Sequence, residues 1–202
     1  MRLSIILLTT LWAFSANASI EAVENYLSEL KTMTANFKQQ SPDGTISTGK
    51  FQLKRPSKMR WAYNPPTPVL MVTRGKYLTY YDYELNQVSD VPMDDTLLSV
   101  ITQQGIKFDD SNLTVAEHFE ENGFITVTIE QKDAPDQGSL GMVFDASPMQ
   151  LKHLIVTDAT QGVTQIALTD INEGIQLEDK LFEFKDPRVG GKNKKYNRFG
   201  SE

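Results

Sequence analysis

From Asp43-Gly44 onward, apolar and polar residues alternate along most of this 202-residue chain. An alternation with a period of two places successive side chains on opposite faces of an extended strand. Turn signals such as Asn64-Pro65-Pro66, Arg74-Gly75 and Asn122-Gly123 interrupt it at short intervals. Strands therefore dominate the chain, and the short connections favour antiparallel pairing.

The positions of these patterns predict both the strands and their overall arrangement. We expect strands at 33–40, 45–55, 58–63, 68–73, 76–82, 86–92, 123–131, 138–145, 150–157, 162–170 and 181–185. A sheet of this many short strands usually curls into a barrel, a half-barrel or two layers. The fold class that we predict is mainly β (α+β), an incompletely closed antiparallel β half-barrel with a helical lid and an N-terminal amphipathic helix.

Two segments depart from the strand pattern and predict the helices. Apolar residues at Ile20, Val23, Leu27, Leu30 and Met33 fall on one helical face, with Ser19 as a candidate cap. In 94–120, the residues Leu97, Leu98, Ile101 and Ile106 predict one or two short helices followed by a loop, which is acidic from 109 to 122. Helical insertions of this kind commonly cover the open end of a barrel.

The first 18 residues have the composition of a secretory signal peptide. Arg2 precedes an apolar run from Leu3 to Phe14, and Ala16-Asn17-Ala18 is a small-residue cleavage site. The run is about a dozen residues, against roughly 20 for a membrane span, which makes a membrane anchor the weaker alternative. We expect a signal at 1–18, a carrier domain at 19–188, a basic flexible tail at 189–202, and export to the periplasm of a Gram-negative bacterium.

The charge distribution argues against a nucleic-acid partner. The net charge is −6, but the last sixteen residues carry +4, which leaves −10 on the rest of the chain. Proteins that bind nucleic acid need a basic surface to displace counterions from phosphates. The basic tail is expected to be a solvated end, with attraction to anionic lipid or an acidic partner as the alternative.

The sequence offers little for catalysis. The chain has no cysteine, which excludes thiol chemistry, disulfides and an acylated N-terminal cysteine of its own. It has two histidines, His118 and His153, and lacks the HExxH, P-loop, GxGxxG and GxSxG motifs. The pairs Asp94-Asp95 and Asp109-Asp110 lie in polar loops, where capping and solvation explain carboxylates. We predict no catalytic residue, no metal and no cofactor.

The stretch from Phe51 to Tyr63 predicts a sheet with one apolar and one charged face. Alternation places Phe51, Leu53 and Arg55 on one side, and it places Met59, Trp61 and Tyr63 together on the next strand. A guanidinium on the apolar face needs partners for its donors. Arg55 is therefore either a strand-end residue that reaches solvent or a latch to a covering helix or loop.

Several short stretches of the chain, taken in their order and spacing, resemble one known family. They are Lys54-Arg55-Pro56, Arg60-Trp61-Ala62-Tyr63, Pro65, Leu70 to Val72, Gly75-Lys76-Tyr77-Leu78, Tyr80-Tyr81-Asp82 and Leu85-Asn86-Gln87-Val88. This run resembles the outer-membrane lipoprotein carrier protein family, LolA. Ala35 to Gln40 is similar to that family's opening, and Phe182-Glu183-Phe184 with Pro187 is similar to its last core strand.

The resemblance implies a carrier that binds acyl chains in an apolar cavity and ferries triacylated lipoproteins to the outer membrane. The implied partners are an inner-membrane lipoprotein-releasing ABC transporter and, as a further candidate, an outer-membrane acceptor lipoprotein; we expect a monomer. Arg55 becomes the lid latch. Cavity candidates are Leu27, Met33, Phe37, Phe51, Leu53, Met59, Trp61, Tyr63, Leu70, Leu78, Tyr80, Leu97 and Ile101. Periodicity alone cannot separate such a cavity from a packed core. The alternative function is a lipid- or lipoprotein-sensing module of the same fold that does not transport.

Overall fold

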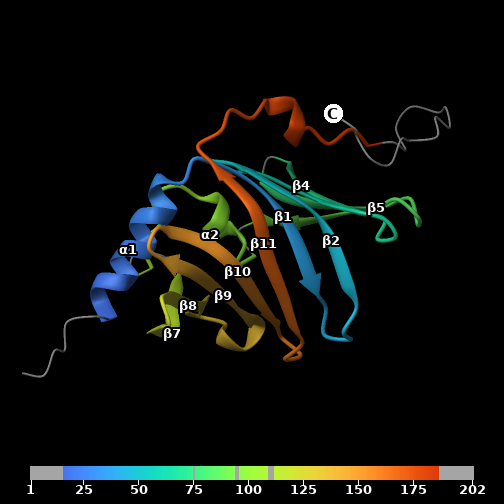
Figure 1. The fold of residues 1–202 in the computed structure, drawn as a ribbon. Coiled ribbons are helices and arrows are strands. Elements are labelled where there is room, and N and C mark those ends of the chain that lie inside the picture. Colours follow the sequence, from blue (N-terminus) through green and yellow to red (C-terminus); the bar gives the residue numbers. More distant parts are fainter. Residues whose placement is uncertain (1–15, 75, 94–95, 109–111, 187–202) are drawn as a thin grey trace, which may run out of the picture.

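A single antiparallel sheet forms the body of the protein in a computed structural model, which describes residues 16–74, 76–93, 96–108 and 112–186 (Figure 1). Most of the predicted signal and all of the predicted tail lie outside these residues. The strands are β1 (Thr32–Gln40), β2 (Ile46–Lys54), β3 (Lys58–Tyr63), β4 (Val69–Arg74), β5 (Tyr77–Asp82), β6 (Gln87–Pro92), β7 (Leu113–Glu121), β8 (Phe124–Gln131), β9 (Gly138–Ala146), β10 (Met149–Asp158) and β11 (Val163–Glu173). The predicted fold class is confirmed.

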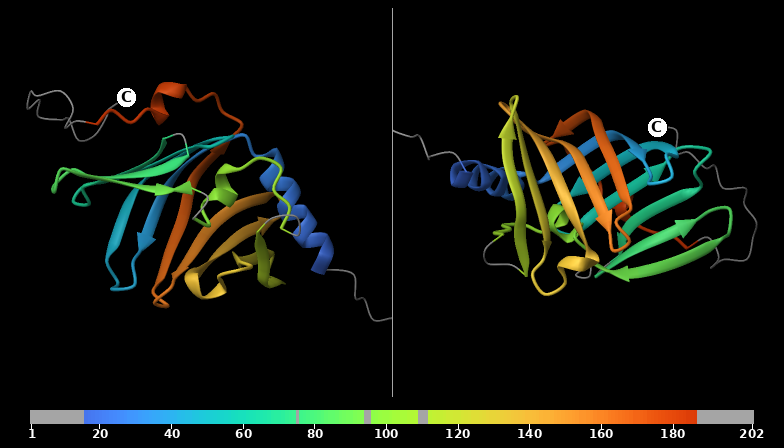
Figure 2. Two further views of the ribbon diagram at one scale, coloured as in Figure 1. Left: turned by 180° about the vertical axis from the view of Figure 1, so that it is seen from behind. Right: turned by 90° about the horizontal axis from the view of Figure 1, so that it is seen from below.

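The strand order explains why the fold has a lid. The 11 strands run β6-β5-β4-β3-β2-β1-β11-β10-β9-β8-β7, so β6 and β7 are the two edges of the open sheet. Two meanders, β1 to β6 and β7 to β11, meet where β1 pairs with β11. The connection from β6 to β7 must therefore pass from one edge to the other. It carries the short helix α2 (Ser99–Thr102), which lies inside the curve of the sheet (Figure 2).

The N-terminal helix α1 spans Ala16–Glu29 and packs against β7 and β10. Its apolar side is the predicted one, because Val23 and Leu27 are fully buried. One detail of the prediction is wrong, because Ser19 lies inside the helix, where its hydroxyl hydrogen-bonds the His118 ring at 2.6 Å. Met33 fits the helical spacing but belongs to β1, in agreement with the strand predicted at 33–40.

Two further expectations about secondary structure are also wrong. Residues 113–121, expected as part of a loop, form the edge strand β7, and a register shift between Val115 and Glu117 breaks their alternation. Residues 181–185, expected as a strand, begin in the last turn of a 3-10 helix, η3 (Asp179–Phe182), and continue across the outside of the sheet (Figure 1). Their apolar residues bury themselves against that face without pairing to a neighbouring strand.

The sheet buries apolar side chains on both faces, but unequally. The larger cluster lies on the concave face and joins residues of both meanders to α1 and to the α2 connection. The smaller cluster lies on the convex face, where Leu70, Val72 and Tyr81 pack with Phe184 of the C-terminal segment, residues 178–186. Among the described residues, no helix has the length and apolar character needed to cross a membrane.

Candidate functional site

The candidate site is the concave face of β1 to β5, where alternation and register bring the predicted apolar residues together. Phe51 pairs with Trp61, and Leu53 pairs with Met59. Trp61 contacts the rings of Phe51 and Phe37, with ring centroids 4.6 and 5.2 Å apart respectively. The residues of this group that are at most 2% exposed are Met33, Phe37, Phe51, Leu53, Met59 and Trp61.

The remaining cavity candidates come from the helices and from the rim of the site. Leu27 of α1 and Ile101 of α2 are fully buried in the same cluster, and Leu78 of β5 is 7% exposed. Tyr63 and Leu97 are half-buried and pack against that cluster. Tyr80 is 39% exposed, which places it at the open rim. Apart from Tyr80, these residues belong to one apolar cluster or pack against it.

Leu70 is the exception, because it lies on the opposite face of the sheet. It pairs with Ala62, whereas its neighbour Met71 pairs with Trp61 on the concave face. Leu70 packs with Val72 and Tyr81 under the C-terminal segment. Residues 69–72 are apolar throughout, so the alternation does not indicate which side chains face inward. The assignment of Leu70 to the cavity is corrected.

Arg55 lies at the end of β2 and binds the α2 connection. Its Nε donates to the carbonyl of Ile101 at 2.6 Å, and its Nη2 donates to that of Val100 at 3.3 Å. The amide of Ser57 donates to Thr102 O at 3.0 Å, so the turn after β2 is joined to α2 twice. The carbonyls at the end of a helix have no partner within it, which makes them natural acceptors for a guanidinium.

Burial of the guanidinium has an electrostatic consequence. Because desolvation disfavours its charged form, the pKa of Arg55 falls to about 10. Arg55 therefore remains cationic at neutral pH, and its two hydrogen bonds are charge-assisted. Its third nitrogen, Nη1, is buried and has no hydrogen-bond partner within the described part of the chain.

Sequence reasoning missed two polar residues that fix α1. Glu24 is 8% exposed; its carboxylate accepts from the Phe108 amide at 2.8 Å and pairs with Lys107 at 2.8 Å. Tyr26 donates to Glu173 at 2.6 Å, and burial, together with this bond, raises its pKa. In the structure, Glu24 ties α1 to the far end of the α2 connection.

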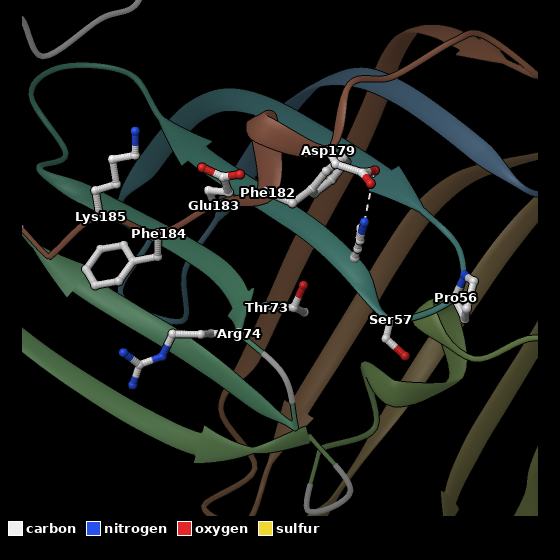
Figure 3. A pocket seen from close by; sticks show the side chains of 10 residues that line it. Pro56, Ser57, Thr73, Arg74, Asp179, Phe182, Glu183, Phe184 and Lys185 are labelled. Carbon is white, nitrogen blue, oxygen red and sulfur yellow. Dashed lines mark ion pairs between the residues drawn. The ribbon is translucent and has the colours of Figure 1, made fainter.

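Two pockets border the site without being part of its buried centre. One, of about 290 Å³, lies where Leu97 and Leu98 approach the ends of β8, β9 and β10, and its lining is mainly apolar. The other, of about 550 Å³, lies outside the sheet between the 56–58 turn and the C-terminal segment (Figure 3). It is bridged by the ion pair of Lys58 with Asp179 at 2.9 Å. In the part of the chain that the structure describes, no group of His, Asp or Glu residues could hold a metal ion.

Comparison with known proteins decides the family. Residues 28–185 match the family model described as outer membrane lipoprotein carrier protein LolA. The chain belongs to the LolA family. Among relatives of this family, an outer-membrane lipoprotein carrier protein from Methylococcus capsulatus is 26% identical over 196 residues, covering 92% of this chain and 94% of the relative. One from Legionella pneumophila is 29% identical over 183 residues, covering 86% and 88%. The crystal structure of an uncharacterized conserved protein from Thermus thermophilus shares the fold, with a TM-score of 0.51 at 10% identity and coverage of 84% and 94%.

Proposed function

We propose that this protein is a non-enzymatic periplasmic carrier that holds the acyl chains of lipoproteins on its concave face and transfers them from the inner to the outer membrane. The observation that carries the proposal is the continuous apolar lining of that face, from Leu27 of α1 across β1 to β5, beneath the α2 connection. Membership of the LolA family supports the same function. The proposed donor is an inner-membrane lipoprotein-releasing ABC transporter, and an outer-membrane acceptor lipoprotein is the proposed recipient.

The chemistry of the cargo requires such a surface. Moving one methylene from lipid into water costs about 0.8 kcal/mol, so exposing three acyl chains costs on the order of 30 kcal/mol. A carrier therefore has to offer a large apolar area that is hidden from water when it is empty. The residues that would supply this area, such as Phe51 and Met59, are fully buried in the closed form.

The lid supplies the means of release. In our proposal, cargo displaces the α2 connection, and breaking the Arg55 hydrogen bonds to Ile101 and Val100 uses part of the binding energy. Binding is then weaker than the apolar contact alone would make it, which allows transfer without ATP. On this account Arg55 is a latch, and the closed form is the empty state.

Native mass spectrometry tests this function directly. The purified protein is mixed with a triacylated lipoprotein in detergent, and the detergent is then diluted below its micelle concentration. We expect one lipoprotein per carrier, whereas the same lipoprotein lacking its acylated cysteine remains unbound. Equal capture of the acylated and non-acylated forms, or of neither form, would refute the proposal.

A further inference from the structure

Trp61 carries a buried donor that the fold itself does not use. The side chain is 1% exposed, and its Nε1 has no hydrogen-bond partner among the described residues. A buried N–H without a partner loses its hydrogen bond to water and gains nothing in return. Burial of an aromatic ring does not itself require an N–H donor. The indole nitrogen therefore calls for an explanation.

Two hydroxyls on the same face have partners. The Tyr63 hydroxyl donates to Gln39 at 2.7 Å, and the Thr73 hydroxyl accepts from the Met59 amide at 2.9 Å. Trp61 instead lies between Phe37 and Phe51, whose rings have no lone pair to offer. Arg55 Nη1 is the other unpaired donor among the described residues, but that guanidinium donates through its two other nitrogens, whereas the indole has one donor and no partner for it.

The position of Trp61 connects the buried part of the face to its rim. Trp61 pairs with Met71, which pairs with Tyr80. Exposure rises along this row, from 1% at Trp61 through a half-buried Met71 to 39% at Tyr80. A ligand that enters at the rim with its chains inward would bring the junction between chain and head group into this row.

We infer that the Trp61 indole donates a hydrogen bond to a carbonyl oxygen of the bound acyl groups. This inference rests on the proposed function. Acyl chains are joined to their head groups through ester or amide carbonyls, which are acceptors without a donor of their own. A carrier with this donor distinguishes acylated cargo from plain hydrocarbon and from ether lipids, although their apolar area is the same. Trp61 is then a residue that determines specificity.

A matched pair of ligands separates this contact from apolar burial. The probes are 1,2-dioctanoylglycerol and its 1,2-dioctyl ether analogue, which lacks both carbonyls, and binding is measured by titration calorimetry. The variants carry benzothienylalanine at position 61, which replaces the indole N–H with sulfur at nearly the same shape, or Tyr77→Phe as a control. Tyr77 is 48% exposed and lies outside the row.

We expect the wild-type protein and Tyr77→Phe to bind the ester about threefold to tenfold more tightly than the ether, as one hydrogen bond would give. The benzothienyl variant is expected to bind the two equally, with its affinity for the ether unchanged. Equal binding of ester and ether by the wild type, or a preference for the ester that survives in the benzothienyl variant, would overturn the role of Trp61 and leave the proposed function standing. Failure of both lipids to bind the wild type would overturn the proposed function and this inference with it.

Nuclear magnetic resonance on the wild-type residue provides a test that does not depend on the analogue folding. The chain has two tryptophans, Trp12 and Trp61, and Trp12 lies in the predicted signal peptide, so the processed protein gives one indole signal. We expect the indole proton to move downfield on addition of the ester and to move less with the ether. The same shift with both lipids would contradict the inference.

Discussion

Replacing Arg55 with leucine should open the lid without unfolding the sheet. The guanidinium donates to Ile101 O at 2.6 Å and to Val100 O at 3.3 Å. A hydrogen bond from a charged donor contributes about 1.5–3 kcal/mol, and the longer contact adds little. Losing about 2 kcal/mol from the closed form shifts the lid equilibrium about 30-fold toward the open form. Apparent affinity for an acyl probe should rise by up to the same factor, and release should slow.

The free energy of unfolding is a poor readout of this change. Burial disfavours the charged form of Arg55, as its lowered pKa shows, so removing the cation regains part of the stability that the lost hydrogen bonds had provided. The lid can instead be followed by the distance between two spin labels. Since the chain has no cysteine, cysteines at the exposed positions Lys50 and Gln103 would be the only labelling sites. Arg60→Leu is the matched control, because Arg60 lies on β3 facing away from the concave cluster, beside Leu70. An Arg55→Leu distance distribution and affinity identical to the wild type would refute the latch.

Three other predictions concern positions that hold the sheet together. Gly49→Ala places a Cβ 2.6 Å from the Phe37 ring and 2.1 Å from a backbone oxygen. The free energy of unfolding measured in urea should therefore fall by about 2 kcal/mol or more, and an unchanged denaturation midpoint would contradict this packing. Phe184→Ala should cost about 1–3 kcal/mol by the same assay while leaving acyl-probe affinity unchanged, because the ring packs on the convex face; weaker probe binding would argue against two independent clusters. Hydrogen bonds led by that from Lys54 lower the pKa of Asp179 to about 2. The stability that ionised Asp179 contributes is therefore present above the unfolded pKa near 4 and is lost as the pH falls through 2. The difference in free energy of unfolding between the wild type and Asp179→Asn should become smaller over that pH range. A difference that stays constant in acid denaturation would contradict the lowered pKa of Asp179.

Alternation predicted the parts of the site in which one face of a strand is apolar and the other is polar. Phe51, Leu53 and Arg55 share the concave face as expected, and so do Met59, Trp61 and Tyr63. The pattern places the Arg55 guanidinium on the apolar side, where a covering element has to meet it. That element is α2, which the topology carries across the open sheet.

Elsewhere the pattern failed for identifiable physical reasons. The bulge near Glu117 shifts the alternation within β7, so an edge strand resembles an acidic loop. Leu70 belongs to a strand that is apolar on both faces, because the C-terminal segment covers its outer side. Phe182 and Phe184 alternate like strand residues, but alternation reports which side is buried and not whether a neighbouring strand is available for pairing. Glu24 could not be assigned because its partner, the Phe108 amide, is 84 positions away in the sequence.

Site-specific photo-crosslinking from the two faces of β4 tests the central claim most directly. Met71 and Leu70 are adjacent in sequence but face the concave and convex sides respectively. A photoreactive amino acid is placed at one or the other, and the carrier is irradiated with a triacylated lipoprotein. We predict adducts through the acyl groups from position 71 and few from position 70. Equal adducts from both positions, or adducts that persist when the lipoprotein lacks its acyl chains, would contradict it.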